Sequence, residues 1–139
     1  ALGNGVTYTG GSGADTISVG ATTKVINTGA GDDSVTVGAS ALGTGGSINA
    51  GTGTDTLVIS GANAATASGS ATFQGTVDGF ERLSITGTDG ATVNLANLDA
   101  LNHVTVGAVG GGNTLALTGA TSGLTLVANA SAAGTISAQ

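Results

Sequence analysis

Isolated apolar side chains recur with a period of nine residues in the first part of the chain. They form two series, Tyr8, Ile17, Ile26 and Val35, and then Ile48 and Leu57. The interval from Val35 to Ile48 is thirteen, which places a four-residue insertion within residues 39–46. A short fixed period is typical of solenoids, in which each repeat is one structural rung. The pattern therefore predicts a short strand at each position, with its apolar side chain pointing inward.

Pairs of apolar positions continue this rhythm beyond residue 77. The pairs are Leu83/Ile85, Val93/Leu95, Val104/Val106, Leu115/Leu117 and Leu124/Leu126, followed by Ile136. Alternation of apolar and polar residues between Gly, Asn, Asp or Ser predicts short strands. The spacing of nine to eleven residues between pairs predicts further solenoid rungs. Helical periodicity is absent, and residues 97–102 allow at most one short helical turn.

A glycine-rich turn that ends in aspartate precedes three of the predicted strands. Residues 10–18 (GGSGADTIS) match G-G-x-G-x-D-x-U-x, with U apolar, and residues 28–36 and 50–58 lack only the first glycine. Glycine permits tight turns and close backbone approach, and carboxylates beside backbone carbonyls are typical Ca²⁺ ligands. The predicted metal-binding residues are Asp15, Asp33, Asp55 and Asp32, with Gly11, Gly13, Gly29, Gly31, Gly51 and Gly53.

These turns are expected along one edge of a flattened roll. Consecutive nonapeptides lie on opposite sides, so equivalent turns recur every eighteen residues, which is the separation of Asp15 and Asp33. The intervening rung has Lys24 at the aspartate position and lacks the glycine pair. Calcium is therefore expected along a single edge. Gly–Asp turns also occur without metal in all-β proteins, so three metal-free turns are the alternative interpretation.

Composition and charge exclude several function classes. The 139 residues include 27 Gly and no Pro, Cys, Met or Trp, and two basic residues stand against eight acidic ones, for a net charge of −6. Two cations exclude a nucleic-acid binder that works by neutralising phosphates. No apolar run is long enough for a membrane span, so membrane insertion is not expected. The lack of cysteine excludes disulfides, thiolate zinc sites and cysteine nucleophiles.

No constellation of residues predicts catalysis. His103 is the single histidine, and the sequence nominates no acid–base partner for it, so a solvent-facing or capping role is expected. Asp78 and Glu81 are expected to form a solvated cluster or to provide one peripheral calcium ligand. Asp89 and Asp99 lie in predicted turns, where aspartate hydrogen-bonds the local backbone. The chain is therefore predicted not to be an enzyme.

The nonapeptides resemble those of the RTX family of secreted calcium-binding β-rolls. In that family an ion lies between turn n and turn n+2. The resemblance implies one ion between the turns ending at Asp15 and Asp33, and a second between those ending at Asp33 and Asp55, with Asp32 as an additional acid. Residues 77–85 (VDGFERLSI) are also similar to segments of bacterial surface-layer proteins of the Caulobacter type, which share the Ala-, Gly-, Thr- and Ser-rich, Cys-free composition.

The period and the resemblance together predict an all-β fold, a parallel β-roll or β-solenoid. They divide it into a calcium-binding β-roll (1–60), a Gly/Ala/Ser/Thr-rich connection (61–76) and a solenoid continuation without calcium motifs (77–139). Because the chain opens at Ala1 without an initiator Met, it is expected to be a segment of a longer protein.

The resemblance also implies a location and a role. It implies type I secretion, a cell-surface location and self-association into a two-dimensional surface-layer lattice. It further implies attachment to lipopolysaccharide through parts of the parent protein outside this chain. Two alternatives stay open, namely the repeat region of an RTX adhesin and the calcium-dependent secretion module of an exported enzyme.

Overall fold

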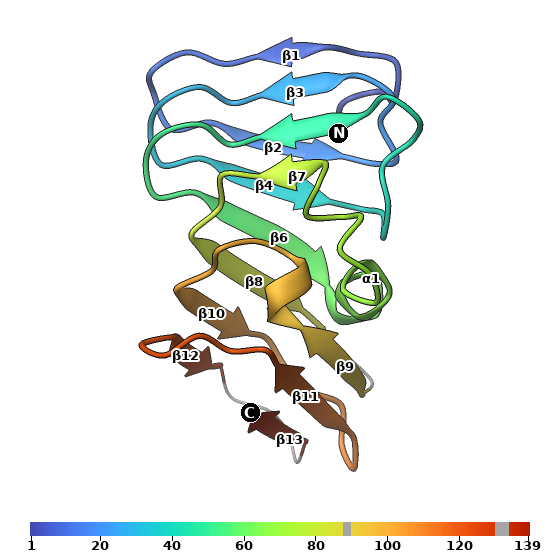
Figure 1. Ribbon diagram of the computed structural model, residues 1–139, viewed down its shortest axis with the longest axis vertical. Coiled ribbons are helices and arrows are strands. Elements are labelled where there is room, and N and C mark those ends of the chain that lie inside the picture. Colours follow the sequence, from blue (N-terminus) through green and yellow to red (C-terminus); the bar gives the residue numbers. More distant parts are fainter. Residues whose placement is uncertain (88–89, 130–133) are drawn as a thin grey trace.

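Short parallel strands wind into a β-solenoid of about six turns (Figure 1). The computed structural model describes residues 1–87, 90–129 and 134–139. All strand pairings within these ranges are parallel, and every one joins a strand to the strand two further along the chain, although β7 (Val77–Asp78) and β9 (Ala91–Asn94) do not pair. This pairing is that of a chain that returns to the same face once per turn, so the predicted all-β solenoid is confirmed.

One six-stranded sheet runs the length of the molecule (Figure 1). Its strands, in order along the chain, are β2 (Thr16–Val19), β4 (Ser34–Val37), β6 (Thr56–Ser60), β8 (Arg82–Thr86), β10 (His103–Val106) and β12 (Thr125–Ala128). In this register Ile17 lies opposite Val35, and Val35 lies opposite Leu57. Each inward residue therefore stacks on its equivalent in the next turn, as the nine-residue period predicts.

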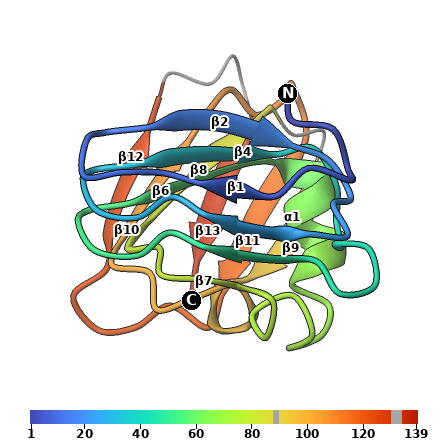
Figure 2. The same cartoon turned by 90° about the horizontal axis from the view of Figure 1, so that it is seen from above.

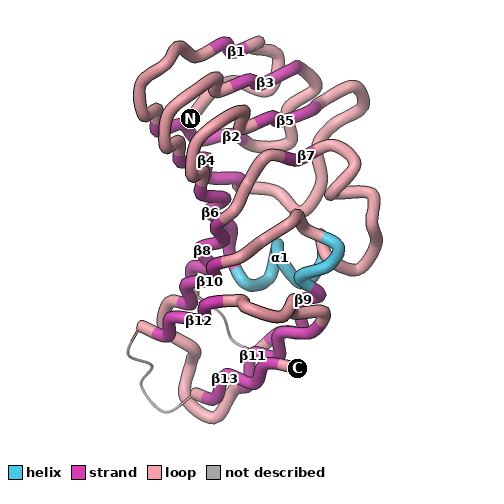
Figure 3. Tube along the Cα trace, turned by 60° about the vertical axis from the view of Figure 1, so that its left-hand side comes forward, coloured by secondary structure: helices cyan, strands magenta, loops and turns pink. Residues whose placement is uncertain are grey.

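The opposite side of the solenoid consists of two smaller sheets (Figure 3). The first contains β1 (Tyr8–Thr9), β3 (Val25–Asn27), β5 (Ser47–Asn49) and β7 (Val77–Asp78), and the second contains β9 (Ala91–Asn94), β11 (Thr114–Thr118) and β13 (Thr135–Ala138). Tyr8 pairs with Ile26, eighteen residues on, and Ile26 pairs with Ile48, twenty-two residues on. The four extra residues lie between β4 and β5, which confirms the predicted insertion.

The core is a column of β-branched and leucine side chains between the sheets. Val35, Leu57, Leu83 and Val104 are fully buried in the long sheet. The strands expected in the second half are present, although Leu95 falls in a short 3₁₀ helix, η1 (Leu95–Asn97), and not in a strand. Leu126 is 36% exposed because β12 is the last strand of its sheet and has β10 on one side.

An α-helix, α1 (Gly61–Ala67), interrupts the connection between β6 and β7. The sequence analysis predicted no helix here, and that prediction is wrong. The Ser60 hydroxyl caps the helix by accepting a hydrogen bond from the Asn63 backbone N–H at 3.3 Å. Alanine favours helix, and Ala64 and Ala67 are buried. The short helical turn expected at 97–102 lies slightly earlier, at η1.

Candidate metal centre

The three glycine-rich turns lie side by side at one edge of the solenoid, opposite the edge that carries α1 (Figures 1 and 2). They connect β1 to β2, β3 to β4 and β5 to β6, and they comprise residues 10–15, 28–33 and 50–55. Backbone hydrogen bonds join them, from Ala30 N to the Gly11 carbonyl (2.9 Å) and from Thr52 N to the Gly29 carbonyl (3.0 Å). The turns therefore form a continuous stack.

Glycine is required where one turn rests on the preceding one. Gly29, Gly31, Gly51 and Gly53 have positive φ, whereas Gly11 and Gly13 of the first turn do not. A Cβ atom at Gly51 would lie less than 3.0 Å from the carbonyl oxygen of Gly29. In the first turn, by contrast, a Cβ atom at Gly11 would meet no atom within 4 Å. The glycines of the later turns thus bring backbone carbonyls close to the neighbouring turn.

Four acidic residues stack in register, three at the ends of these turns and the fourth, Glu81, directly before β8. The last three carboxylates each reach back one turn: Asp33 Oδ1 accepts a hydrogen bond from Asp15 N at 2.7 Å, and Asp55 Oδ1 accepts one from Asp33 N at 2.7 Å. Glu81 Oε2 accepts one from Asp55 N at 2.8 Å. Asp15, Asp33, Asp55 and Glu81 are called the acidic ladder below. Asp32 lies outside it, where its Oδ1 accepts a hydrogen bond from Thr54 N at 2.9 Å.

Two carboxylate oxygens in the ladder are buried without a partner. Asp33 and Asp55 are 1% and 0% exposed, and the Oδ2 atom of each has no hydrogen bond. Because each carboxylate reaches back one turn, one such oxygen lies near each of the two steps from Asp15 to Asp33 and from Asp33 to Asp55. A buried charged oxygen without a partner is costly, so both steps offer an unused ligand atom.

The surroundings of Asp55 disfavour its charged form. Burial raises the pKa of the Asp55 carboxyl above its ordinary value, and the hydrogen bond from Asp33 N opposes that rise. The negative charges of Asp33, Glu81 and Asp32 raise this pKa further. A nearby cation would reverse this balance because it favours the ionised carboxylate.

The oxygen atoms of these turns are of the kind that calcium binds, and carboxylates would supply only part of a coordination shell. Over the described ranges, no three His, Asp or Glu side chains converge into a metal-binding group, because the ladder places one acid on each turn. An ion between two turns would therefore need backbone carbonyl oxygens as well as carboxylates. Calcium accepts such mixed oxygen ligands in flexible geometry.

Tyr8 lies at the N-terminal end of the acidic ladder. Burial raises the pKa of the Tyr8 phenol, and its hydrogen bond to Asp15 and the charges of Asp15 and Asp33 raise it further. The sequence analysis treated Tyr8 as a core residue alone. The structure also places this phenol beside Asp15, at the first step of the ladder.

Glu81 belongs to the ladder. The sequence analysis left two interpretations open for Asp78 and Glu81, a solvated cluster or one peripheral calcium ligand, and it did not predict the hydrogen bond from Asp55 N to Glu81. Asp78 pairs with Asn49 in the opposite sheet and is exposed. A signal in the sequence was available. Residues 55–59 (DTLVI) align with residues 81–85 (ERLSI), and each segment has an acid two residues before the buried leucine of its strand, β6 or β8.

The remaining candidate residues lie away from the turns. Asp99 serves the backbone as predicted: its two oxygens accept hydrogen bonds from Phe80 N and Ala100 N, both at 2.7 Å. Burial raises the pKa of Asp99. His103 begins β10 in register with Arg82 and Thr125 and is half-buried. Asp89 lies outside the described residues.

Comparisons of this chain with protein families, curated proteins and solved structures gave no match. In the part of the chain that the structure describes, no helix has the length and apolar character needed to cross a membrane.

Proposed function

We propose that this chain is a calcium-stabilised structural segment of a secreted bacterial surface-layer protein. The observation that carries the calcium part is the pair of buried, unpartnered Oδ2 atoms of Asp33 and Asp55 in a stack of glycine-rich turns. The surface-layer part is supported by the resemblance of the repeats, of residues 77–85 and of the overall composition to that class of protein.

The charges of the acidic ladder support a requirement for divalent cations. Adjacent parallel strands are about 4.8 Å apart, so carboxylates in register repel one another along this edge. Two bound Ca²⁺ ions contribute a charge of +4 against the net −6 of the chain, which leaves −2. Calcium that binds the folded chain alone also stabilises it by linkage.

The residues that would hold the ions follow from the two ladder steps. Asp15 and Asp33 would serve the first ion and Asp33 and Asp55 the second, with backbone carbonyls of the adjacent glycine-rich turns completing each set. Asp32 adds negative charge beside the second step. The bound ions would supply electrostatic cross-links between turns, which is a structural role.

A structural role fits the arrangement of the molecule better than catalysis does. The polar groups of the candidate site are spread along a stack of turns, whereas an active site brings several reactive groups to one point. Regular solenoid faces suit repeated contacts between copies. We therefore propose self-association into a cell-surface lattice, with lipopolysaccharide contacted by other parts of the parent protein.

Terbium luminescence tests the metal site directly, because Tb³⁺ is a hard, oxygen-seeking cation that tyrosine sensitises. Tyr8 is the only tyrosine and the chain has no tryptophan, so sensitised emission would come from an ion near the first ladder step. We expect emission that calcium displaces and that Asp33→Asn removes. Asp78→Asn, which changes an exposed acid on the opposite sheet, is the matched control and should leave it unchanged.

Either of two results would contradict the metal site. One is the absence of sensitised emission from folded protein. The other is emission of equal strength in the Asp33→Asn variant and in the wild type.

Electron microscopy of the purified parent protein tests the lattice. Ordered two-dimensional sheets with calcium, and none with chelator, are expected. Particles that become compact with calcium but stay dispersed would reject the surface layer and favour an adhesin or a secretion module.

A further inference from the structure

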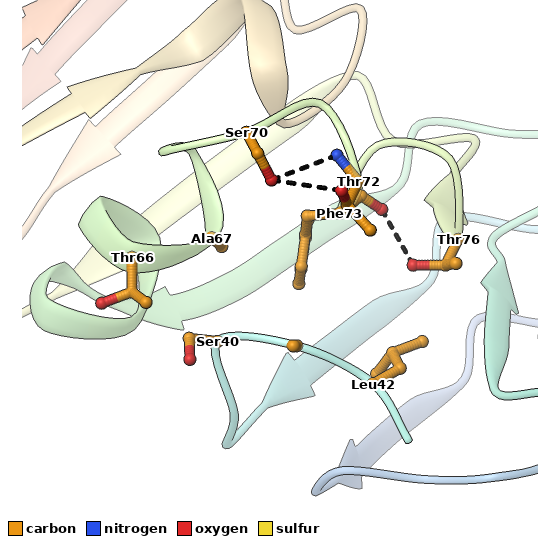
Figure 4. Close-up of a pocket in the computed structure, with 9 residues that line it drawn as sticks. Ser40, Leu42, Thr66, Ala67, Ser70, Thr72, Phe73 and Thr76 are labelled. Atoms are coloured by element: carbon orange, nitrogen blue, oxygen red, sulfur yellow. Dashed lines mark hydrogen bonds between the residues drawn. The ribbon is translucent and has the colours of Figure 1, made fainter. Parts of the chain in front are cut away.

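The repeat is interrupted by two insertions. They lie next to each other and form the walls of a pocket. Residues 38–46 connect β4 to β5, and residues 61–76, which include α1, connect β6 to β7. The pocket between them has a volume of about 310 Å³ (Figure 4). It lies on the edge of the solenoid opposite the acidic ladder (Figure 1).

These insertions exceed what a turn of the solenoid requires. Residues 20–24 make the equivalent connection from β2 to β3 in five residues, whereas 38–46 uses nine and 61–76 uses sixteen. Insertions in a solenoid map to loops on one face, which is often the binding face. A pocket formed by the two longest connections of the first half is therefore placed where a binding site is expected.

One wall of the pocket is apolar. Phe73 is buried, and its ring points toward the loop that carries Ser40 and Leu42 (Figure 4). Leu42 is half-buried and Ala67 closes the wall from α1. Because Phe73 and Ala67 are buried, the apolar surface open to a ligand is mainly that of Leu42, and such an aliphatic wall suits the apolar face of a ring-shaped ligand.

The rest of the lining consists mainly of hydroxyl groups, and three of the five already donate their protons within the chain. Thr66 Oγ1 donates to the Ala62 carbonyl (3.1 Å), Ser70 Oγ to Thr72 Oγ1 (3.2 Å) and Thr76 Oγ1 to the Phe73 carbonyl (3.0 Å). A hydroxyl has one proton and two acceptor lone pairs. Toward a ligand these three groups are therefore hydrogen-bond acceptors, whereas the remaining two hydroxyl groups can also donate.

The lining also restricts the charge of a ligand. No charged side chain is among the described residues that line the pocket. A cation would lack a carboxylate partner among these residues, and an anion would lack a basic one. Ligand pockets start at about 300 Å³, so this pocket suits a small ligand.

We propose that this pocket binds a neutral, hydroxylated ring of monosaccharide size. Its apolar face would rest on Leu42, which Phe73 supports from behind, and its O–H groups would donate to the side-chain oxygens of Thr66, Ser70 and Thr76. The proposal is independent of calcium binding, because none of these residues belongs to the acidic ladder.

Saturation-transfer NMR tests this with the methyl hexopyranosides of glucose, galactose and mannose as probes. We expect signal from at least one of them. Glucuronate and glucosamine, which add a negative or a positive charge to the same ring, should give weaker signal than the methyl glucoside. All samples contain calcium, and circular dichroism of the same samples verifies folding, so loss of the solenoid is distinguishable from loss of the ligand.

Two variants locate the binding. Ala41→Trp places a large side chain at an exposed lining position and should abolish the signal. Ala21→Trp makes the same change at an exposed position of the equivalent, shorter loop outside the pocket and should leave the signal unchanged. Absence of signal from all three neutral probes, or signal that survives Ala41→Trp, would overturn the proposal.

Discussion

Asp33 uses its two carboxylate oxygens differently. Oδ1 accepts a short hydrogen bond from the backbone of the preceding turn, while Oδ2 is buried without a partner. Its own backbone N–H donates to Asp55, so this residue contributes to both steps of the acidic ladder. In the absence of metal, the negative charge of Asp33 is compensated by a single amide dipole. Because one oxygen of this buried carboxylate has no partner, substitutions at Asp33 should change the free energy of unfolding.

Asp33→Asn should separate metal-free stability from calcium binding. The amide keeps an oxygen for Asp15 N and removes a buried charge, so in chelator the free energy of unfolding should rise by about 1 kcal/mol. The stabilisation by calcium should be lost. Urea denaturation of wild type, Asp33→Asn and the exposed control Asp78→Asn measures both effects. A variant that is less stable than wild type in chelator yet still gains stability from calcium would contradict this prediction.

The raised pKa of Asp55 predicts how metal-free stability depends on pH. Because the folded chain holds the Asp55 proton at higher pH than the unfolded chain does, it binds more protons in this window, and stability increases as pH falls. In chelator, the free energy of unfolding should therefore rise from neutral pH through the raised pKa and level off near the ordinary value of 3.8.

The raised pKa of Asp99 also increases stability as the pH falls. Comparison of the wild type with Asp55→Asn therefore isolates the contribution of Asp55. That variant should lose part of the increase in stability on acidification. Equal pH dependence of the two proteins, measured by denaturation across this range, would show that Asp55 is not the responsible group.

At the scale of the elements, the turns depend on glycine for contact with one another. Gly51 has a φ of 92°, and its Cα faces the Gly29 carbonyl of the preceding turn. Gly11 occupies the equivalent position in the first turn, where no turn precedes it. These two glycines occupy the same position of the turn motif and have different surroundings, so they form a matched pair.

Gly51→Ala should destabilise the chain by about 2 kcal/mol or more, since the added methyl group is strained in φ and collides with a carbonyl. Gly11→Ala should change stability by less than about 1 kcal/mol. Thermal unfolding followed by circular dichroism compares the two. Similar losses in both variants would indicate that the turns do not pack as tightly as the structure shows.

The strands were predictable and the helix was not, for physical reasons that particular residues illustrate. Ile17 and Ile26 are large, and they stand out against a polar background at the fixed interval of nine residues. Helix α1 buries Ala64 and Ala67, small residues that carry little periodic signal, and it is only seven residues long. Its N-terminus is set by a single serine cap at Ser60. Short helices of this kind depend on tertiary packing, which sequence periodicity does not reveal.

The candidate site was predictable in position but not in detail. The spacing of Asp15, Asp33 and Asp55 placed them on one edge, and the structure brings them into register. The spacing did not reveal that the carboxylates of Asp33 and Asp55 each accept a hydrogen bond from the preceding turn. The place of Glu81 in the ladder was not predicted because the turn before it lacks the glycine pattern, although the alignment of β6 and β8 contains the information.

The molecule as a whole separates its features along two edges. A single parallel sheet extends from β2 to β12, the acidic ladder occupies one edge, and the insertions with their pocket occupy the other (Figure 1). The core between the sheets consists mostly of Val, Ile, Leu and Ala, with two buried Phe. Each turn contacts its neighbours in sequence order, so stabilising one step of the ladder stabilises the adjacent turns.

The central claim is that calcium binds the folded solenoid through the acidic ladder. The most direct test is the free energy of unfolding, measured by urea denaturation over a series of calcium concentrations, with magnesium at matched ionic strength as the control. We expect it to rise by about 1.4 kcal/mol per bound ion for each tenfold increase in calcium above the dissociation constant. Magnesium should have a much smaller effect. The same unfolding free energy in calcium, magnesium and chelator would contradict the claim.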